Sequence, residues 1–311
     1  MNKIGLIVPT LNAGNLWEAW LRSFAQQTLK PDYLLVIDSS SSDNTVALAR
    51  EQGFDVQIIP KPEFNHGGTR QSGISQLPDA DIIVFLTQDA LLANVDAIER
   101  LIANFDDKSV GAAYGRQLPH LKAGPIAAHA RLFNYPGIGQ KRSLKDKSQY
   151  GIKTVFISNS FAAYSRNALM QVGGFPVDTI MNEDTYVAGK LLMSGWKVAY
   201  CAEAQVFHSH DYSFKDEFKR YFDIGVFHAQ TAWLQQTFGG ASGEGLRFVI
   251  SEMRYLLKKS PWLLASAILR TGLKWLGFKL GTLYKKIPPL LLNIFSMHKA
   301  YWSRTAINQS N

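Results

Sequence analysis

Apolar and polar stretches alternate regularly along residues 3–115. Apolar runs of strand length occupy residues 4–8, 33–37, 56–59, 82–86 and 110–114. The segments between them have helical spacing, at residues 15–27, 43–52, 69–76 and 95–105. Strands that alternate with helices over short connections form parallel sheets with right-handed crossovers. The pattern therefore predicts an α/β fold with a doubly wound, mostly parallel sheet.

Two acids follow strands of this predicted sheet. The run at 82–86 is apolar throughout, which indicates a strand buried on both faces, and Asp89 comes just after it. Asp38 follows the run at 33–37 in the same way. Ligands of open α/β sheets bind beyond the carboxyl ends of the strands, and a carboxylate there can accept a hydrogen bond from a ribose or a pyrimidine imide. Taken alone, either acid is also explained as a loop residue or a helix cap.

The pattern is weaker beyond residue 115. Proline and glycine are frequent in residues 116–153, and an irregular insertion of this length is often a functional loop. We expect short strands at residues 154–157, 196–200 and 204–207, then one long amphipathic helix at 212–238. The glycine-rich segment 239–243 is typical of a linker. It divides the chain into a domain of residues 1–238 and a C-terminal module of residues 239–311.

The net charge of +8 is concentrated in that module. Residues 246–304 contain eleven lysines and arginines and a single acid, Glu252. Long apolar residues lie among these cations, but no uncharged run reaches the roughly 20 residues that a membrane-spanning helix needs. On a helical wheel Arg270, Lys274 and Lys285 share one side, whereas Lys279 and Lys286 fall on the more apolar side.

Tryptophan, leucine and lysine with almost no acid are typical of a helix that lies in an anionic membrane interface. Nucleic acid would account for the charge but not for so much aliphatic surface, so we expect no nucleic-acid partner. A helical hairpin that buries its apolar face within a homo-oligomer is the alternative. The prediction is peripheral attachment to the inner face of the cytoplasmic membrane.

Composition and missing motifs exclude several classes of protein. The single cysteine, Cys201, excludes an internal disulfide and a cysteine-based zinc site. The first residues lead directly into a short strand that is too brief for the apolar core of a signal peptide, so we expect a cytoplasmic protein. No G-x-G-x-x-G follows the first strand and no G-x-x-x-x-G-K-[ST] occurs, which argues against a dinucleotide dehydrogenase or a P-loop enzyme.

Four motifs in order resemble those of family 2 inverting glycosyltransferases. They are Ile7-Val8-Pro9-Thr10-Leu11-Asn12, then Val36-Ile37-Asp38-Ser39-Ser40-Ser41-Ser42-Asp43-Asn44-Thr45, then Phe85-Leu86-Thr87-Gln88-Asp89, and finally Asn182-Glu183-Asp184. The resemblance implies an A-type glycosyltransferase fold. It also implies that the nucleotide-sugar donor is held near Pro9, Thr10, Asn12, Asp38 and Gln88.

The same resemblance implies a divalent cation, Mg²⁺ or Mn²⁺, bound by Asp89. This chain departs from the family pattern, because Thr87 stands where the first acid of the D-x-D motif is expected, and Ser39 stands where many members carry a second acid. With one carboxylate, the donor diphosphate and water would complete the oxygen shell. His208, in the sequence His208-Ser209-His210, is a further candidate for the metal or the diphosphate, and His210 a weaker one.

The segment Phe64-Asn65-His66-Gly67-Gly68-Thr69-Arg70 is the most distinctive of the chain. Gly67 and Gly68 would let backbone N–H groups approach the donor diphosphate, His66 could bond the diphosphate or the sugar, and Arg70 adds a guanidinium suited to phosphate. A tight turn without a ligand is the alternative. This segment and Thr87-Gln88-Asp89-Ala90 resemble bacterial rhamnosyltransferases, which implies dTDP-β-L-rhamnose as the donor.

Glu183 and Asp184 precede a helical stretch. In an inverting transfer one carboxylate suffices as general base for the acceptor hydroxyl. The family resemblance makes Asp184 that base and gives Glu183 an orienting role. Without the other motifs, two acids at a helix start would simply favour the helix dipole.

The sequence thus predicts an inverting rhamnosyltransferase that acts on a growing polysaccharide or a lipid-linked oligosaccharide. Two alternatives stay open. One is the same fold with another donor, such as a UDP-hexose. The other is a non-catalytic membrane- or nucleic-acid-binding protein on a degenerate sheet domain, for which Thr87 is the best argument.

Overall fold

The fold is organised by one mixed sheet of nine strands. The computed structural model describes residues 2–240 and 243–308. The strand order is β3-β2-β1-β4-β8-β6-β9-β5, and β7 pairs with β9. The parallel half consists of β1 (Ile4–Thr10), β2 (Tyr33–Asp38), β3 (Asp55–Ile58) and β4 (Ile82–Leu86). Because β2 and β4 flank β1 in parallel, the carboxyl ends of all three meet at one edge of the sheet.

The second half of the sheet mixes directions. The strand β8 (Phe161–Ser165) runs antiparallel to both β4 and β6 (Val110–Leu118), and β9 (Lys197–Phe207) runs parallel to β6. The short strands β5 (Leu91–Leu92) and β7 (Gln140–Arg142) both pair antiparallel with β9. The predicted α/β class is confirmed. The antiparallel β8 enters between β4 and β6, although it follows both in sequence.

Helices cover both faces of the sheet. On one face lie α1 (Asn15–Ala25), α2 (Thr45–Glu51) and α4 (Ala97–Ile102), and on the other lie α3 (His66–Gln76), α7 (Arg166–Gln171) and α8 (Glu183–Met193). Along β1, Leu6 and Val8 pack in the core between the sheet and α1, α2 and α4, whereas Ile7 packs in the core on the side of α3, α7 and α8. The central strands β1 and β4 therefore bury both of their sides, which explains their uninterrupted apolar runs.

Two of the predicted strand assignments are wrong. Residues 151–155 form a 3₁₀ helix, η4 (Gly151–Val155), in which the Thr154 hydroxyl donates to the Gly151 carbonyl oxygen at 2.7 Å. The two strands expected at 196–200 and 204–207 are a single strand, β9. A bulge separates its halves, because Gly115 pairs with Cys201 while the next residue, Arg116, pairs with Gln205.

The segments expected to be irregular or continuous also differ. Residues 116–153 contain α5 (Pro125–Asn134), η3 (Leu144–Asp146) and α6 (Lys147–Tyr150), and Pro125 occupies the first turn of α5, where its missing N–H has no consequence. The predicted helix at 212–238 is two helices, α9 (Phe214–Gln230) and α10 (Ala232–Phe238). They separate at Thr231, whose hydroxyl donates to the Phe227 carbonyl oxygen.

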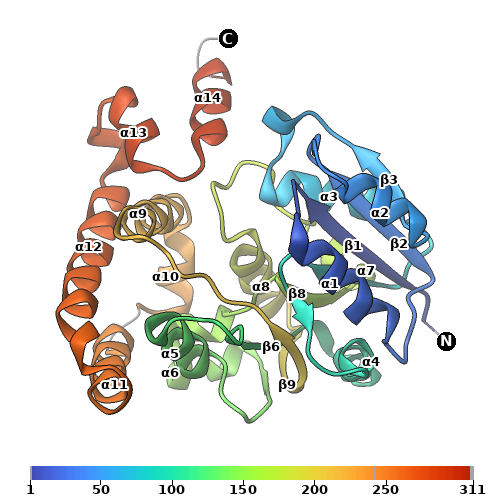
Figure 1. Ribbon diagram of the computed structural model, residues 1–311, viewed down its shortest axis with the longest axis horizontal. Coiled ribbons are helices and arrows are strands. Elements are labelled where there is room, and N and C mark those ends of the chain that lie inside the picture. The colour runs from blue at the N-terminus through green and yellow to red at the C-terminus, as the bar shows by residue number, and fades with distance from the viewer. Residues whose placement is uncertain (1, 241–242, 309–311) are drawn as a thin grey trace.

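The C-terminal segment forms the helices α11 (Glu244–Lys259), α12 (Leu264–Thr282), α13 (Pro289–Phe295) and α14 (Lys299–Asn308). Of the predicted linker at 239–243, residues 241–242 lie outside the described residues. Figure 1 shows α12 lying along α9, on the side of the molecule away from β1–β3. A Cβ added at Gly281 of α12 would come within 2.0 Å of the Phe222 carbonyl oxygen of α9, so the two backbones touch.

The helix α12 turns two of its cations, Arg270 and Lys274, inward, whereas Lys279 and several of its large apolar side chains are exposed. Arg270 and Lys274 do share one side, as the helical wheel predicts, and this side faces Glu217 of α9 at 3.3 and 3.5 Å. Ile268 and Trp275 point away from the protein and are 64% and 63% exposed. No helix within residues 2–240 and 243–308 is both long enough and apolar enough to cross a bilayer.

Candidate active site

A cavity of about 920 Å³ opens where β4, β6 and β9 end and β8 begins. Residues from the starts of α3 and α8 and from α5 line it, and α9 and α12 supply its far wall. The chain segments that meet here are far apart in sequence. Of the residues that the sequence predicts, the structure brings His66, Arg70, Asp89, Glu183, Asp184 and His208 to this cavity.

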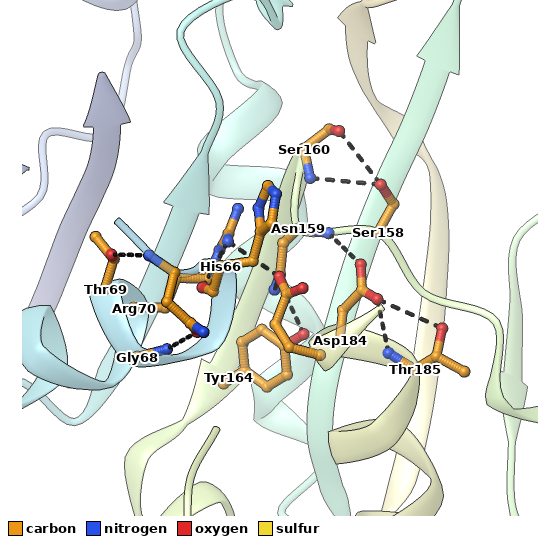
Figure 2. Close-up of polar contacts among 12 residues, drawn as sticks. His66, Gly68, Thr69, Arg70, Ser158, Asn159, Ser160, Tyr164, Asp184 and Thr185 are labelled. Carbon is orange, nitrogen blue, oxygen red and sulfur yellow. Dashed lines mark hydrogen bonds and ion pairs between the residues drawn. The ribbon is translucent and has the colours of Figure 1, made fainter. Parts of the chain in front are cut away.

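Asp184 lies at the start of α8 with its carboxylate held by backbone donors. The preceding Asn182 adopts a left-handed conformation, with φ of 58°, from which the helix starts. The backbone N–H groups of Asn159 and Thr185 donate to the two carboxylate oxygens of Asp184 at 3.1 and 2.7 Å, as Figure 2 shows. These bonds fix the direction of the carboxylate.

The pKa of Asp184 is raised to about 7, first by burial and then by the negative charge of Glu183. The two backbone donors oppose this shift without cancelling it. A carboxyl group with a pKa near neutrality accepts and releases a proton readily at physiological pH. Asp184 therefore has the properties that a general base needs.

Glu183 is held in a different environment. Its carboxylate pairs with Arg70 at 3.0 Å and accepts a hydrogen bond from the Asn159 side-chain amide at 2.9 Å. The Tyr164 hydroxyl in turn donates to the amide oxygen of Asn159 at 2.7 Å. Burial alone would raise the pKa of Glu183, but the charge of Arg70 and the hydrogen bond from Asn159 hold it below its ordinary value. Glu183 thus stays ionised and supports the Asn159 side chain, whose backbone N–H bonds Asp184.

The segment 64–70 does not have the conformation that the sequence led us to expect. Helix α3 already begins at His66, and the Asn65 side chain caps it by accepting a hydrogen bond from the Gly68 N–H at 2.8 Å. A Cβ at Gly67 would lie 1.8 Å from the Pro176 carbonyl oxygen. Packing explains Gly67 and the cap uses the N–H of Gly68, so the segment is the first turn of a helix and not a tight turn; a contact of Gly67 or Gly68 with the donor diphosphate stays a prediction.

Arg70 and His66 also have partners within the protein. The Arg70 guanidinium is buried between Glu183 and the His66 carbonyl oxygen, to which it donates at 2.9 Å. This placement makes Arg70 a support for Glu183 rather than a guanidinium open to phosphate. The His66 ring faces the His298 ring at 5.0 Å between centroids, and burial lowers the pKa of His66, so this ring is neutral.

Three side chains that could bind a metal ion converge in the cavity. Asp89 Oδ2 lies 3.4 Å from His208 Nε2 and 3.5 Å from His210 Nε2, and the two Nε2 atoms are 3.1 Å apart. Gln117 Oε1 lies 2.9 Å from His208 Nδ1. If Nδ1 carries the proton of this hydrogen bond, Nε2 presents a lone pair to Asp89, as in many histidine–metal sites.

The charges of this cluster suit a divalent cation. Burial lowers the pKa of His208, and burial together with the neighbouring His208 lowers the pKa of His210 to about 4, so both rings are neutral. Burial would raise the pKa of Asp89, but a hydrogen bond from a proton on His208 Nε2 holds it well below its ordinary value, and a bound cation would take the place of that proton. Two neutral imidazoles and a carboxylate are the donor set of a transition-metal site, so the residues fit the expected cation. His210, the weaker candidate from sequence, belongs to the cluster.

The remaining predicted donor residues lie outside the lining of the cavity. They are Pro9, Thr10, Asn12, Asp38 and Gln88. Asp38 is fully buried and accepts hydrogen bonds from the Thr10 hydroxyl at 2.7 Å and from both the N–H and the hydroxyl of Ser41. Gln88 bonds the backbone of Leu11 with both ends of its amide. These residues tie together the loops that follow β1, β2 and β4, and their contact with a donor stays a prediction.

Several residues that line the cavity belong to no recognisable sequence motif, so the sequence did not point to them. Asn159 sits in a Ser-Asn-Ser segment that predicts only a turn, and Gln117 ends an ordinary strand. Arg131 of α5 donates to the His208 carbonyl oxygen at 2.8 Å. Arg220 of α9 lies over the Tyr212 ring at 5.5 Å, and within the described residues no carboxylate forms an ion pair with it. Both arginines occur in helical stretches, where a cation usually indicates a solvated face.

Comparison with known proteins gives a consistent result. The family model described as "Glycosyl transferase family 2" matches residues 6–173, more than half of the chain. The chain is 50% identical to the O-antigen chain rhamnosyltransferase RfbN of Salmonella typhimurium over 309 residues, which cover 99% of this chain and 98% of that protein. It is 48% identical to the O-antigen chain rhamnosyltransferase WbaN of Salmonella anatum over 311 residues, which cover 100% and 99%.

Solved structures agree with the fold. A mannosyltransferase from Pyrobaculum calidifontis, solved with GDP-mannose and Mn²⁺, superposes with a TM-score of 0.57 at 19% identity, covering 99% of this chain and 86% of that one. The S. aureus protein TarS, solved with UDP, gives a TM-score of 0.51 at 14% identity, covering 91% of each chain. At these identities the likeness shows the fold alone. The family model and the two full-length relatives show that this chain belongs to glycosyl transferase family 2, as its motifs predict.

Proposed function

We propose that this glycosyltransferase is an inverting rhamnosyltransferase. It transfers L-rhamnose from dTDP-β-L-rhamnose to a hydroxyl group of a growing polysaccharide or a lipid-linked oligosaccharide. The two relatives that match over the full chain, and that are named O-antigen chain rhamnosyltransferases, support the sugar. The observation that carries the mechanism is the pair at the start of α8, in which Glu183 is ion-paired while the pKa of Asp184 is raised to about 7.

In this reaction Asp184 is the general base. The acceptor hydroxyl gives its proton to the Asp184 carboxylate as its oxygen forms a bond to the anomeric carbon of rhamnose. The bond between that carbon and the diphosphate oxygen breaks on the opposite face, so the configuration at the carbon inverts. Glu183 is a positioning residue, since it holds Asn159, whose backbone N–H orients Asp184.

Asp89, His208 and His210 would hold the divalent cation, Mg²⁺ or Mn²⁺. Two imidazole nitrogens favour Mn²⁺, because Mg²⁺ prefers an all-oxygen shell. When bound, the cation neutralises negative charge on the departing dTDP. Arg220 and Arg131 add protein cations to the same cavity. Burial lowers the pKa of His66 and of His210, and the positive charge of Arg220 lowers both further. The Arg220 guanidinium therefore acts on both histidines.

The nucleoside would lie beside the loops that follow β1 and β2. The Asp38 carboxylate is fully buried and bonded to Thr10 and Ser41, so in this conformation it would hold these loops in place beside the nucleoside. We further propose that residues 1–238 form the catalytic domain, that residues 239–311 form the module that meets the membrane, and that the enzyme works at the inner face of the cytoplasmic membrane. Arg270 and Lys274 line the same cavity as Asp184, which supports a site to which both parts contribute.

A donor panel tests this function. The full chain is incubated with dTDP-β-L-rhamnose, UDP-glucose or UDP-galactose, with Mn²⁺ or with EDTA, and release of the nucleoside diphosphate is followed. We expect turnover of the dTDP-sugar in Mn²⁺, and loss of that turnover in EDTA and in the Asp89→Ala variant. Preferential turnover of a UDP-hexose would replace rhamnose by another donor. Absence of turnover with every donor, under conditions in which donor binding is detected by calorimetry, would favour the non-catalytic alternative.

A further inference from the structure

The outward side of α12 carries exposed apolar side chains, with the exposed Lys279 among them, and we call this side the outer face of α12. It consists of Trp262, just before the helix, and of Ile268, Leu269, Trp275, Leu276 and Leu283. All six are at least 42% exposed. Helix α13 extends the surface through Leu290, which is 74% exposed. An amphipathic helix normally turns such a side to the core, so this surface calls for a partner.

The position of α12 is fixed by its other side. Gly277 and Gly281 bring its backbone against α9, where a Cβ on Gly277 would lie 2.4 Å from the Phe218 carbonyl oxygen. Arg270 and Lys274 form ion pairs with the buried Glu217. Rotating the helix to bury its apolar side would break these pairs and lose the close backbone contact. The exposure of the outer face is therefore a consequence of how α12 is anchored.

Exposed lysines flank the outer face along the chain, and residues 246–304 contribute no exposed acid. Lys258 and Lys259 end α11, Lys279 lies near the end of α12, and Lys285 and Lys286 follow it, all of them exposed. The only acid in residues 246–304 is Glu252, which is 1% exposed. Two tryptophans lie on the face itself. Apolar residues, tryptophans and flanking lysines together are the features of a protein surface that rests in a lipid interface.

A second copy of the chain fits this face poorly. In a twofold contact each surface patch meets the same patch of its partner. The lysines beside the outer face would then meet lysines, and residues 246–304 offer no exposed carboxylate to pair with them, so such like-charge contacts oppose association. An anionic partner with an apolar layer beneath its charges fits both properties at once.

We propose that the outer face of α12 docks on a bilayer that contains anionic phospholipids. The apolar side chains enter the boundary between headgroups and acyl chains, and the surrounding lysines contact lipid phosphates. The helix lies along the surface and does not cross it, in agreement with its cationic inner side.

This orientation brings the active-site cavity close to the lipid. Ser266, Arg270 and Lys274, on the inner side of α12, line the same cavity as Asp184. The cavity and the bilayer are then separated by a single helix, which is about 10 Å across. A glycan whose lipid end stays in the bilayer can reach Asp184 past the edge of α12. This last step rests on the proposed function, which takes the acceptor to be lipid-linked.

Vesicle flotation of the full chain tests the docking surface. We expect the wild-type chain to float with vesicles of phosphatidylcholine and phosphatidylglycerol, and to bind much less to phosphatidylcholine alone. The Trp275→Ser, Leu276→Ser double variant should lose flotation, because both side chains leave the apolar face. Replacing Lys258 and Lys259 by glutamine should weaken binding by about fivefold per lysine.

The matched control is Ile138→Ser, which removes an apolar side chain that is 82% exposed in a different segment of the chain. It should float like the wild type. Equal flotation of the Trp275 double variant and the control would overturn the proposal. A second outcome would also overturn it: the wild-type chain does not bind anionic vesicles and sediments as a dimer, and the Trp275→Ser, Leu276→Ser double variant sediments as a monomer. Neither donor nor acceptor is present, so failure here leaves the proposed transfer reaction to its own test.

Discussion

At the scale of single residues, Glu183 and Asp184 are neighbours in sequence, but the pKa of Glu183 is lowered and that of Asp184 is raised. Arg70 lies 3.0 Å from Glu183 and keeps that carboxylate ionised. Asp184 has no cation as a partner; it accepts hydrogen bonds from two backbone N–H groups and, at 3.4 Å, from the Thr185 hydroxyl, and burial and the charge of Glu183 raise its pKa to about 7. Separated pKa values in adjacent acids are typical of sites in which one acid transfers a proton and the other does not.

This arrangement predicts the pH dependence of turnover. A general base must be deprotonated, so kcat should rise with pH through the pKa of Asp184, near 7. Glu183→Gln removes the negative charge that raises this pKa and should shift the rising limb to lower pH, along with a reduced maximal rate. Glu252→Gln is the control, because it changes a buried acid outside the cavity lining and should leave the limb in place. A limb that does not move in Glu183→Gln would refute the electrostatic account of Asp184.

Sequence reasoning located the acids but not their partners. The motifs point to Glu183, Asp184 and Asp89 because these types of residue recur with fixed spacing beside strand ends. Arg70 meets Glu183 from a position more than a hundred residues away, and Asn159 meets both acids from an unremarkable turn. Such contacts depend on how the strands are ordered in space. The sequence pattern does not encode that order locally.

At the scale of elements, the contact between α9 and α12 decides which side of α12 faces solvent. Glycines on both helices lack the side chains that would otherwise keep the backbones apart. Gly225 of α9 lies against the Phe278 carbonyl oxygen of α12, and Gly281 of α12 lies against the Phe222 carbonyl oxygen of α9. The close approach places Arg270 and Lys274 against Glu217. The orientation of α12 therefore depends on three glycines and one carboxylate.

Two glycines of α12 offer a matched test of this contact. Gly281→Ala would put a methyl group 2.0 Å from the Phe222 carbonyl oxygen, and should lower the free energy of unfolding by about 1–3 kcal/mol, as overpacked substitutions do. Gly272→Ala in the same helix meets nothing within 4 Å and should be neutral or stabilise by up to about 1 kcal/mol. Urea unfolding followed by circular dichroism measures both. Equal stability of the two variants would show that the backbones are not in contact.

The elements that the sequence predicted best are those whose apolar pattern is compatible with only one position in the fold. The strands β1, β2 and β4 are apolar on both sides and could only be central strands. The strand expected at 154–157 is instead part of a 3₁₀ turn, since Val155 and Ile157 are buried there without pairing into the sheet. Periodicity also cannot tell which side of α12 faces inward, because apolar residues and cations occur on both sides of the helix.

At the scale of the whole molecule, positive charge and apolar surface are gathered at the end of the chain, yet this end also helps to enclose the active site. Residues of α12 and His298, just before α14, line the cavity together with Asp89 and Asp184. The overall α/β architecture and the family could be predicted from sequence. The shared cavity could not, because it arises from the packing of α12 on α9.

The stereochemistry of transfer tests the central claim most directly. Wild-type chain, dTDP-β-L-rhamnose, Mn²⁺ and a lipid-linked or polysaccharide acceptor are incubated, and the one-bond coupling between C1 and H1 of the new rhamnoside is measured by NMR. A single base at Asp184 predicts an α-L-rhamnosyl product from the wild type. It predicts no product from Asp184→Asn, although that variant still binds the donor. A β-linked product, or wild-type turnover by Asp184→Asn, would contradict the account.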